Sequence, residues 1–270
     1  MRSRIQTQRT VSLVLSLAGL LMLTLTVTVP QLITGVDPLA TNTAAVFSPP
    51  SAAHPFGTDQ TGRDVFSRVI YGARTTVLSA VIAAAAAALV GAAWGVMLAF
   101  LPRSLRQLGA RVLDAAMALP DFLIALLIMA YTGPGAVGVT LAVALATMPG
   151  YARIALLQAR SAITSEAHQT ARVLGIGKLR RAFVYVLPET LRPIIAVAVL
   201  GVGFAVLMIA ALTFLGLGLT PPDPDWGAML SQGKLFVNRG WWAIVFPGLA
   251  LLGTVALFTV LGKKLEARWS

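Results

Sequence analysis

Long apolar runs constrain this chain most strongly, because a helix needs about 20 mostly apolar residues to cross a bilayer. The 270 residues contain six such runs: 11–29, 77–101, 112–131, 136–152, 194–219 and 241–262. Backbone groups in lipid must bond within their own segment, which favours helices. The runs do not alternate between apolar and polar residues as barrel strands do. We therefore expect an all-α membrane protein with six transmembrane helices.

The composition agrees with a membrane protein and excludes several classes of site. Apolar residues make up 57% of the chain and charged residues 11%, compared with about 25% charged residues in soluble domains. There is no cysteine and there are only two histidines, so disulfides, thiolate sites and cysteine nucleophiles are excluded. The net charge of +11 comes from basic residues beside the apolar runs, so we expect no nucleic-acid partner.

The first apolar run follows three arginines and could belong to a signal peptide. It is longer than the usual apolar region of about 7–15 residues, and no clear cleavage site follows it directly. We therefore expect a retained first transmembrane helix at 11–30, preceded by a cytoplasmic segment at 1–10.

The distribution of lysine and arginine predicts the orientation of the chain. With the N-terminus inside the cell, sixteen of the 21 basic residues fall on the inner side. Both termini are then cytoplasmic, including a tail at 263–270. Segments 31–76 and 220–240 face outward, and the first of these carries an interfacial helix. The transmembrane core is 77–262, with a cytoplasmic loop at 158–192.

The apolar runs hold few groups that support chemistry. Four of them have no ionisable residue in their central parts, whereas ion-coupled carriers usually place such groups there. In the third run, Asp114 and Asp121 lie seven residues apart and so would share a helix face. Pro120 can kink this run. We expect structural roles for both carboxylates, with a polar patch near a transport pathway as the alternative.

Catalytic patterns are absent from the sequence. His54 and His168 fall on opposite sides of the membrane in the expected topology, and neither belongs to a nucleophile motif. No Walker-type phosphate loop occurs. We therefore expect a transport subunit rather than an enzyme, with no catalytic residues, no metal site and no bound cofactor. The energy for uphill transport would have to come from a partner.

The polar stretch at 165–193 predicts a short amphipathic helix in the cytoplasmic loop. Thr164 or Ser165 can cap its start, and Glu166 suits its first turn. The helix would present a small apolar stripe, formed by Ala167, Ala171 and Leu174.

After this helix, Gly175 and Gly177 predict a stop and a turn. Pro188 and Pro193 predict a break in the chain before the fifth span. The physical pattern alone leaves two interpretations open. The helix docks into a groove on another protein, or the basic residues hold the loop against anionic lipid headgroups.

The spacing Ala171-x3-Gly175-x9-Tyr185-x-Leu187-Pro188 resembles the EAA loop of ABC importer permeases. This resemblance implies a coupling helix that inserts into a cytoplasmic ATPase subunit. Gln169 stands where the family has Glu, which affects any charge contact made by that Glu. The residues that the resemblance assigns to coupling are Glu166, Gln169, Thr170, Ala171, Arg172, Gly175, Leu187 and Pro188.

Further segments resemble the "C"-type subunits of dipeptide, oligopeptide and nickel permeases. These are HPFGTDQTGRDVFSRVIYGAR at 54–74, LTFLGLGLTPPDPDWGAML at 212–230 and FPGLAL at 246–251. The resemblance covers roughly 54–262 and implies the type I ABC importer permease fold. Ile209 departs from the family, because many peptide-type members have Glu there, and the ending LGKKLEARWS also differs.

The outer segment has a physical interpretation of its own. Its turn and capping residues are Gly57, Thr58, Asp59, Gly62, Arg63 and Asp64. The apolar residues that follow fit a short helix lying on the outer membrane interface. Anchoring at the interface and contact with an extracytoplasmic binding protein are both open at this point.

The resemblance implies a permease subunit of an ATP-driven importer of di- or oligopeptides in the bacterial inner (plasma) membrane. Its partners would be a homologous "B"-type permease, one or two ATPase subunits or a fused pair, and a substrate-binding protein. ATP and Mg²⁺ would be bound by the ATPases. The alternatives are an ABC permease for nickel, a metal chelate or haem-like cargo, and a secondary carrier. A membrane enzyme is a third class.

Overall fold

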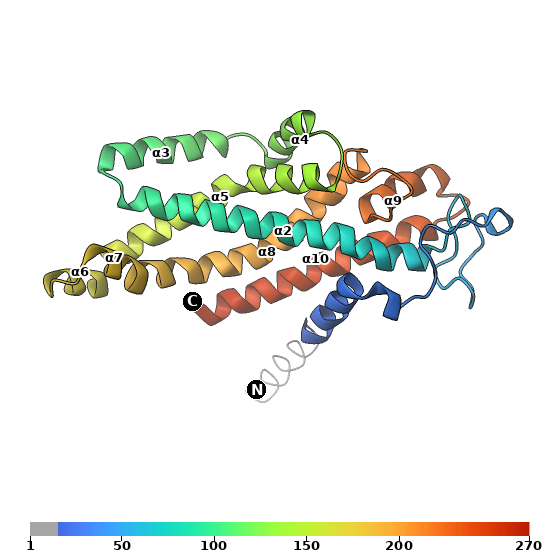
Figure 1. Cartoon of the computed structure of the whole chain (residues 1–270), viewed down its shortest axis with the longest axis horizontal. Helices are drawn as coiled ribbons and strands as arrows, with labels where there is room; N and C mark the ends of the chain where they lie inside the picture. Colours follow the sequence, from blue (N-terminus) through green and yellow to red (C-terminus); the bar gives the residue numbers. More distant parts are fainter. Residues whose placement is uncertain (1–15, 270) are drawn as a thin grey trace.

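The computed structural model describes residues 16–269, and four long helices run along its length (Figure 1). They are α2 (Val65–Phe100), α5 (Ala136–Thr164), α8 (Leu187–Phe214) and α10 (Trp242–Trp269). Each belongs to a helical stretch that is long and apolar enough to cross a membrane. These helices account for the second, fourth, fifth and sixth apolar runs. The described part of the chain is therefore all-helical, as the sequence predicts.

The first apolar run is represented by a shorter apolar helix, Ser16–Thr28. It is followed by the 3₁₀ turns η1 (Pro30–Leu32) and η2 (Thr43–Ala45) in the segment that leads to α2. The predicted N-terminal segment 1–10 and the start of the first predicted span lie outside the described residues.

The third apolar run is not one continuous helix. It is divided between α3 (Arg103–Ala116) and α4 (Asp121–Thr132), which are bent by 86° relative to each other. Pro120 precedes α4, and the residue before a proline is disfavoured in helical conformation, so the break falls here. The expectation that Asp114 and Asp121 share a helix face is wrong. The described residues thus contain four spanning helices, or five if the bent pair is one span.

The predicted interfacial helix after residue 64 is not a separate element. Asp64 caps the start of α2, because its carboxylate accepts a hydrogen bond of 2.7 Å from the backbone N–H of Ser67. The helix then continues without interruption to Phe100. Val65 and Val69 are buried in the main core instead of facing a membrane surface.

The break that the sequence predicts at Pro188 and Pro193 does not occur. The chain is helical through α7 (Lys178–Arg181), the π-helical turn η3 (Ala182–Val186) and α8. Pro188 lies directly after η3, and a local π-helical adjustment of this kind lets a helix tolerate the hydrogen bond that proline removes. Pro193 is accommodated inside α8. The hydrogen bonds of η3 run from residue i to i+5, and α8 begins directly after this wider turn.

Small residues allow α2 and α5 to pack closely. A side chain added at Gly91 would place its Cβ 2.7 Å from the carbonyl oxygen of Met148 and 2.8 Å from Cβ of Tyr151. Such contacts are too short, so only glycine permits this helix separation. Alanines of both helices fill the surrounding core. Close packing of small residues is a main source of helix association in lipid.

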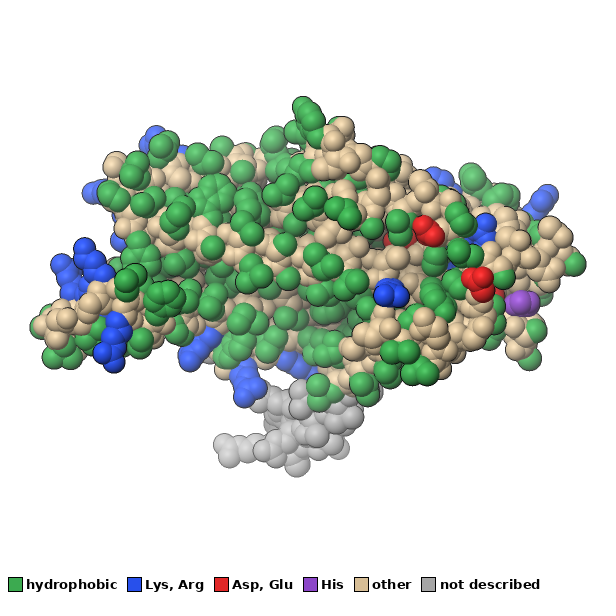
Figure 2. Space-filling view, in the orientation of Figure 1, with side chains coloured by type: hydrophobic (Ala, Val, Ile, Leu, Met, Phe, Trp, Pro, Cys, Tyr) green, Lys and Arg blue, Asp and Glu red, His purple; other side chains and the backbone are tan. Residues whose placement is uncertain are grey.

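Charged residues lie mainly at the two ends of the molecule, and the surface between them is largely apolar (Figure 2). Lys and Arg side chains gather at the end that carries α6 (Glu166–Val173) and α7. The outer segment and α9 (Trp226–Gly233), followed by the turn η4 (Lys234–Phe236), lie at the opposite end (Figure 1). The last turns of α10 point toward the end that carries α6 and α7 (Figure 1).

Candidate functional site

The short helix predicted at the start of the polar stretch is present as α6. Ser165 caps it, with its side-chain oxygen accepting a hydrogen bond of 3.4 Å from the N–H of His168. Thr164 instead bonds to carbonyls of its own helix α5. Glu166 lies in the first turn. Ser165, the second of the two caps that the sequence allows, is therefore the one that the structure uses.

Gly175 ends α6, as predicted. Its φ of +74° is a left-handed conformation that L side chains rarely adopt. The N–H of Ile176 donates to the carbonyl of Ala171 at 3.0 Å, and the N–H of Gly175 donates to that of Arg172 at 3.1 Å. These bonds satisfy the free carbonyls at the end of the helix. The chain turns sharply at this point and enters α7.

The predicted apolar stripe of α6 is only partly exposed. Ala171 is 2% exposed and packs inward, whereas Leu174 is 74% exposed. The exposed apolar surface continues into the next turn and η3. We name this surface the apolar tip, and it consists of Val173, Leu174, Leu179 and Phe183. Sequence reasoning missed three of these four, because it treated α6 alone and not the surface that the Gly175 turn assembles.

The other predicted coupling residues lie on α6 and at the start of α8. Glu166, Gln169, Thr170 and Arg172 are exposed on α6, Pro188 is exposed in the first turn of α8, and Leu187 is half-buried. The amide of Gln169 donates a hydrogen bond of 3.1 Å to the carbonyl of Ile163 near the end of α5. A carboxylate has no proton to donate here. This bond gives a physical reason for glutamine at this position.

His168 and Arg181 form a polar cluster behind the tip. His168 is 7% exposed, and burial, followed by the positive charges of Arg181 and Arg172, lowers the pKa of its imidazole. Nδ1 of His168 and both Nε and Nη1 of Arg181 are buried, and none has a hydrogen-bond partner among the described residues. This end of the molecule therefore combines exposed apolar side chains with unsatisfied donors. Both features are typical of a surface that binds another protein.

The predicted outer-segment residues turn inward rather than outward. Thr58 is 0% exposed, Asp59 5% and Asp64 4%. Gly57 and Gly62 are also buried, and Arg63 is half-buried. The side chains of Thr58, Asp59 and Asp64 are therefore held inside the folded outer segment. Their positions are structural.

Asp59 and Thr58 hold this outer segment in place. One carboxylate oxygen of Asp59 accepts bonds from the N–H groups of Thr61 at 2.8 Å and Arg63 at 3.0 Å. The indole N–H of Trp242, at the start of α10, donates to the carbonyl of Thr58 at 2.9 Å. The predicted turn is thereby fixed to the last helix.

Arg68 is a buried residue that sequence reasoning counted only as an outer charge. Its side chain is 1% exposed. Nε lies 3.6 Å from the carboxylate of Asp59, and Nη1 donates to the carbonyls of Pro38 at 3.3 Å and Pro222 at 3.0 Å. One guanidinium therefore joins three segments that are distant in sequence. No local pattern indicates this role.

An open pocket of ≈ 290 Å³, which we name the central cavity, is lined by residues of α2, α4, α5 and α8. Its polar side chains are Asp121, Thr147 and Tyr151. The other aspartate of the third run, Asp114, is instead 3.3 Å from Arg153. The structural role expected for Asp114 is therefore supported by an ion pair, whereas Asp121 faces this cavity.

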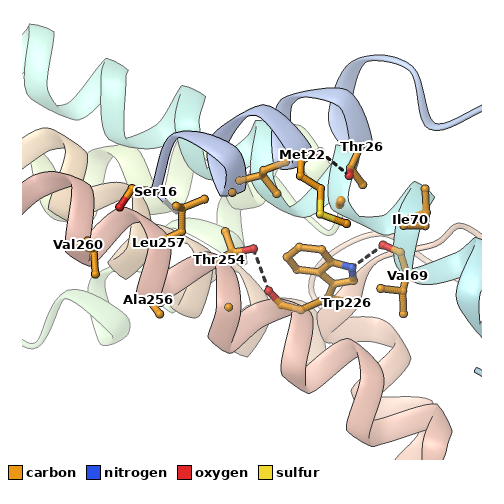
Figure 3. A pocket seen from close by; sticks show the side chains of 15 residues that line it. Ser16, Met22, Thr26, Val69, Ile70, Trp226, Thr254, Ala256, Leu257 and Val260 are labelled. Atoms are coloured by element: carbon orange, nitrogen blue, oxygen red, sulfur yellow. Dashed lines mark hydrogen bonds between the residues drawn. The ribbon is translucent and has the colours of Figure 1, made fainter. Parts of the chain in front are cut away.

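A larger, apolar cavity of ≈ 550 Å³ lies between the first helix, α2 and α10 (Figure 3). Its polar side chains all have partners. Thr26 and Thr254 bond to carbonyls of their own helices, Trp226 donates to the carbonyl of Val69 at 2.9 Å, and Ser16 accepts from Lys264. The cavity therefore suits apolar chains and offers no unsatisfied polar side chain to a polar cargo.

Comparison with known protein families shows what kind of protein this arrangement belongs to. The family described as "Binding-protein-dependent transport system inner membrane component" matches residues 91–270. The chain belongs to this family. It is therefore an inner-membrane permease component of an ABC transport system, a transport subunit and not an enzyme. Membership generally implies an ATPase, another permease and a binding protein as partners.

Similar sequences extend over most of the chain. The di/tripeptide transport system permease protein DppC of Pseudomonas aeruginosa is 36% identical over 78% of this chain and 69% of its own length. The dipeptide permease DppC of Alkalihalophilus pseudofirmus is 34% identical over 93% and 84%. DppC of Escherichia coli K12 is 36% identical over 82% and 76%. The predicted resemblance to "C"-type permeases is confirmed.

Solved structures confirm the fold at lower identity. A chain of the methionine ABC transporter MetNI superposes with a TM-score of 0.63 at 14% identity, covering 75% of this chain and 96% of that one. A chain of an amino acid ABC transporter gives 0.59 at 16% identity, covering 75% and 94%. The fold is therefore like that of type I ABC importer permeases.

Proposed function

We propose that this chain forms the membrane pathway of an ATP-driven importer of dipeptides, together with a homologous "B"-type permease. The observation that carries the proposal is its 34–36% identity to permeases named for dipeptide transport, extending over most of their length. The chain contributes no motor of its own that the sequence reveals. Coupling to ATP hydrolysis must then pass through a contact with another subunit.

We propose that the apolar tip and the His168–Arg181 cluster form this contact with an ATPase subunit. One or two ATPases, separate or fused, would carry the ATP and Mg²⁺. The tip offers large apolar side chains at the basic end of the molecule. An excess of basic residues is typical of the cytoplasmic side, which supports placing this end and both termini inside the cell. The loop therefore offers an exposed apolar surface and lies at the end that we place in the cytoplasm, as a docking site for a cytoplasmic protein requires.

A displacement of α6 by the ATPase would be transmitted to the pathway through α5 and α8. The Ser165 cap and the bond from Gln169 to Ile163 hold α6 against the end of α5. The helical stretch from Lys178 to Phe214 continues directly into α8. Both α5 and α8 line the central cavity. Movement of the tip would thereby open and close the pathway, as alternating access requires.

The structure offers no observation in favour of nickel as cargo. Ile209 is 2% exposed and lies in the main core, so its apolar character reflects packing and says nothing of the cargo. No group of three potential metal ligands occurs among the described residues. Dipeptides remain the substrate class with positive support, from the relatives.

Competition for uptake tests this assignment. The chain is reconstituted in proteoliposomes with its cognate second permease, ATPase and binding protein, and uptake of a labelled dipeptide is measured. We expect unlabelled dipeptides to compete more strongly than tetrapeptides, nickel chelates or haem. If a nickel chelate or haem abolishes the signal while dipeptides do not, the cargo assignment is wrong.

A further inference from the structure

The central cavity lies at half the depth of the bundle. Ala84 is near the middle of α2, Tyr151 near the middle of α5 and Gly201 near the middle of α8, and all three line it. Helices of this length can span the bilayer, so the cavity lies within the membrane-spanning part of the bundle. Asp121, the first residue of α4, lines the cavity, so the cavity lies beside the break between α3 and α4. Interrupted helices near the midplane are a recurrent feature of transporter binding sites.

Two polar groups of this cavity lack partners. Asp121 lies in the first turn of α4 and lines the cavity, and within residues 16–269 no cation or hydrogen-bond donor pairs with its carboxylate. Tyr151 is 7% exposed, and its hydroxyl likewise has no hydrogen-bond partner in the described part of the chain. Ionisable groups inside a membrane are costly and normally paired. Two unpaired groups facing one cavity therefore indicate a polar ligand.

Small residues beside the carboxylate of Asp121 and the hydroxyl of Tyr151 leave room around these two groups. A Cβ atom added at Gly201 would collide with the hydroxyl of Tyr151, so a side chain there would displace it. Gly150 and Ala205 also line the cavity with little bulk. The start of a helix favours a negative charge, which suits a carboxylate at Asp121. The site therefore presents a carboxylate and a phenol to a cavity walled by small and apolar residues.

We propose that Asp121 and Tyr151 bind the α-ammonium group of the peptide as it passes the middle of the membrane. This inference rests on the proposed dipeptide import. An ammonium group is the cationic group that every unmodified peptide carries, and it donates three hydrogen bonds, which a carboxylate and a phenol oxygen can accept. The volume of ≈ 290 Å³ is near the lower end of the range of about 300–1,000 Å³ for small-molecule sites. It suits the end of a short peptide.

The test uses the complete importer in proteoliposomes with its loaded binding protein. We expect Asp121→Asn to lower the number of dipeptides transported per ATP hydrolysed by about tenfold or more, the effect of losing a hydrogen bond to a charged group. Tyr151→Phe should lower it less, and Asp121→Glu should retain more of it than Asp121→Asn. Asp114→Asn is the matched control, because its carboxylate pairs with Arg153 outside the cavity, and its transport ratio should stay within twofold of wild type.

A labelling experiment adds a readout of occupancy. The chain has no cysteine, so Thr147→Cys places a single thiol in the cavity. We expect dipeptide turnover to slow the labelling of this thiol by at least threefold and to leave Thr254→Cys, in the apolar cavity of Figure 3, unaffected.

Three outcomes are decisive. A transport ratio for Asp121→Asn equal to that of wild type overturns the inference. A loss of the second permease from the purified Asp121→Asn complex also overturns it, because Asp121 would then pair with that subunit instead of the peptide. If wild type itself transports no dipeptide, the proposed function fails instead, a result that the wild-type assay shows before any variant is compared.

Discussion

Shortening Leu174 should weaken the binding of the ATPase subunit without affecting the fold. Leu174 is 74% exposed, so about three quarters of the usual gain of about 1.5–3 kcal/mol for burying a leucine side chain is available to a partner. Leu174→Ala removes most of that gain, or about 1–2 kcal/mol. This corresponds to roughly five- to thirtyfold weaker binding.

The assay is the affinity of the purified ATPase for this chain and its partner permease in nanodiscs. Leu235→Ala is a matched control, because Leu235 is 73% exposed in η4 at the opposite end of the molecule. Both variants should have the thermal stability of wild type, since neither side chain is buried. Wild-type affinity for Leu174→Ala, or an equal loss for Leu235→Ala, would refute the assignment of the apolar tip as the docking surface.

Three other predictions concern the structure around the two ends. Arg68→Met should lower the free energy of unfolding by about 3–5 kcal/mol in detergent–SDS titrations, because it leaves the buried Asp59 unpaired. A double-mutant cycle with Asp59→Asn should show a coupling energy above about 0.5 kcal/mol. Additive effects of the two substitutions would contradict the pairing. Gln169→Glu should speed amide exchange in α6 because the bond to Ile163 is lost; unchanged protection would contradict it. Since the pKa of His168 is lowered in the folded loop, the unfolded loop takes up a proton first as pH falls below 6.5. Loop stability, followed by amide exchange corrected for intrinsic rates, should therefore be full above this pH and fall below it, and His168→Gln should remove the effect.

Sequence periodicity predicts the features that depend on neighbouring residues. The long apolar runs become α2, α5, α8 and α10, because length and hydropathy alone decide whether a helix suits lipid. Ser165 and Gly175 mark the ends of α6 as predicted, since capping depends on side-chain chemistry within one turn. The central loop is therefore largely predictable from its own residues.

The features that were not predicted depend on contacts between distant segments. Arg68 acquires its role from carbonyls of Pro38 and Pro222, which are far away in the sequence. The sequence places Asp114 and Asp121 on one helix face, but a bend of 86° separates them. Pro120 predicts a kink at this place, whereas the size of the bend depends on how α4 packs against α5. Tyr151 carries no signal in the sequence, because its importance arises from the pocket that residues of four helices line together.

The most direct test of the central claim is the dependence of dipeptide uptake on ATP hydrolysis and on this chain. Proteoliposomes with the complete importer are compared in the presence of ATP, of a non-hydrolysable ATP analogue, and of an imposed ion gradient without nucleotide. A further sample contains ATP but lacks this chain. We predict accumulation of dipeptide against its gradient only with ATP and the complete set of subunits. Equal uptake with the analogue, or uptake driven by an ion gradient alone, would contradict the account and indicate a secondary carrier.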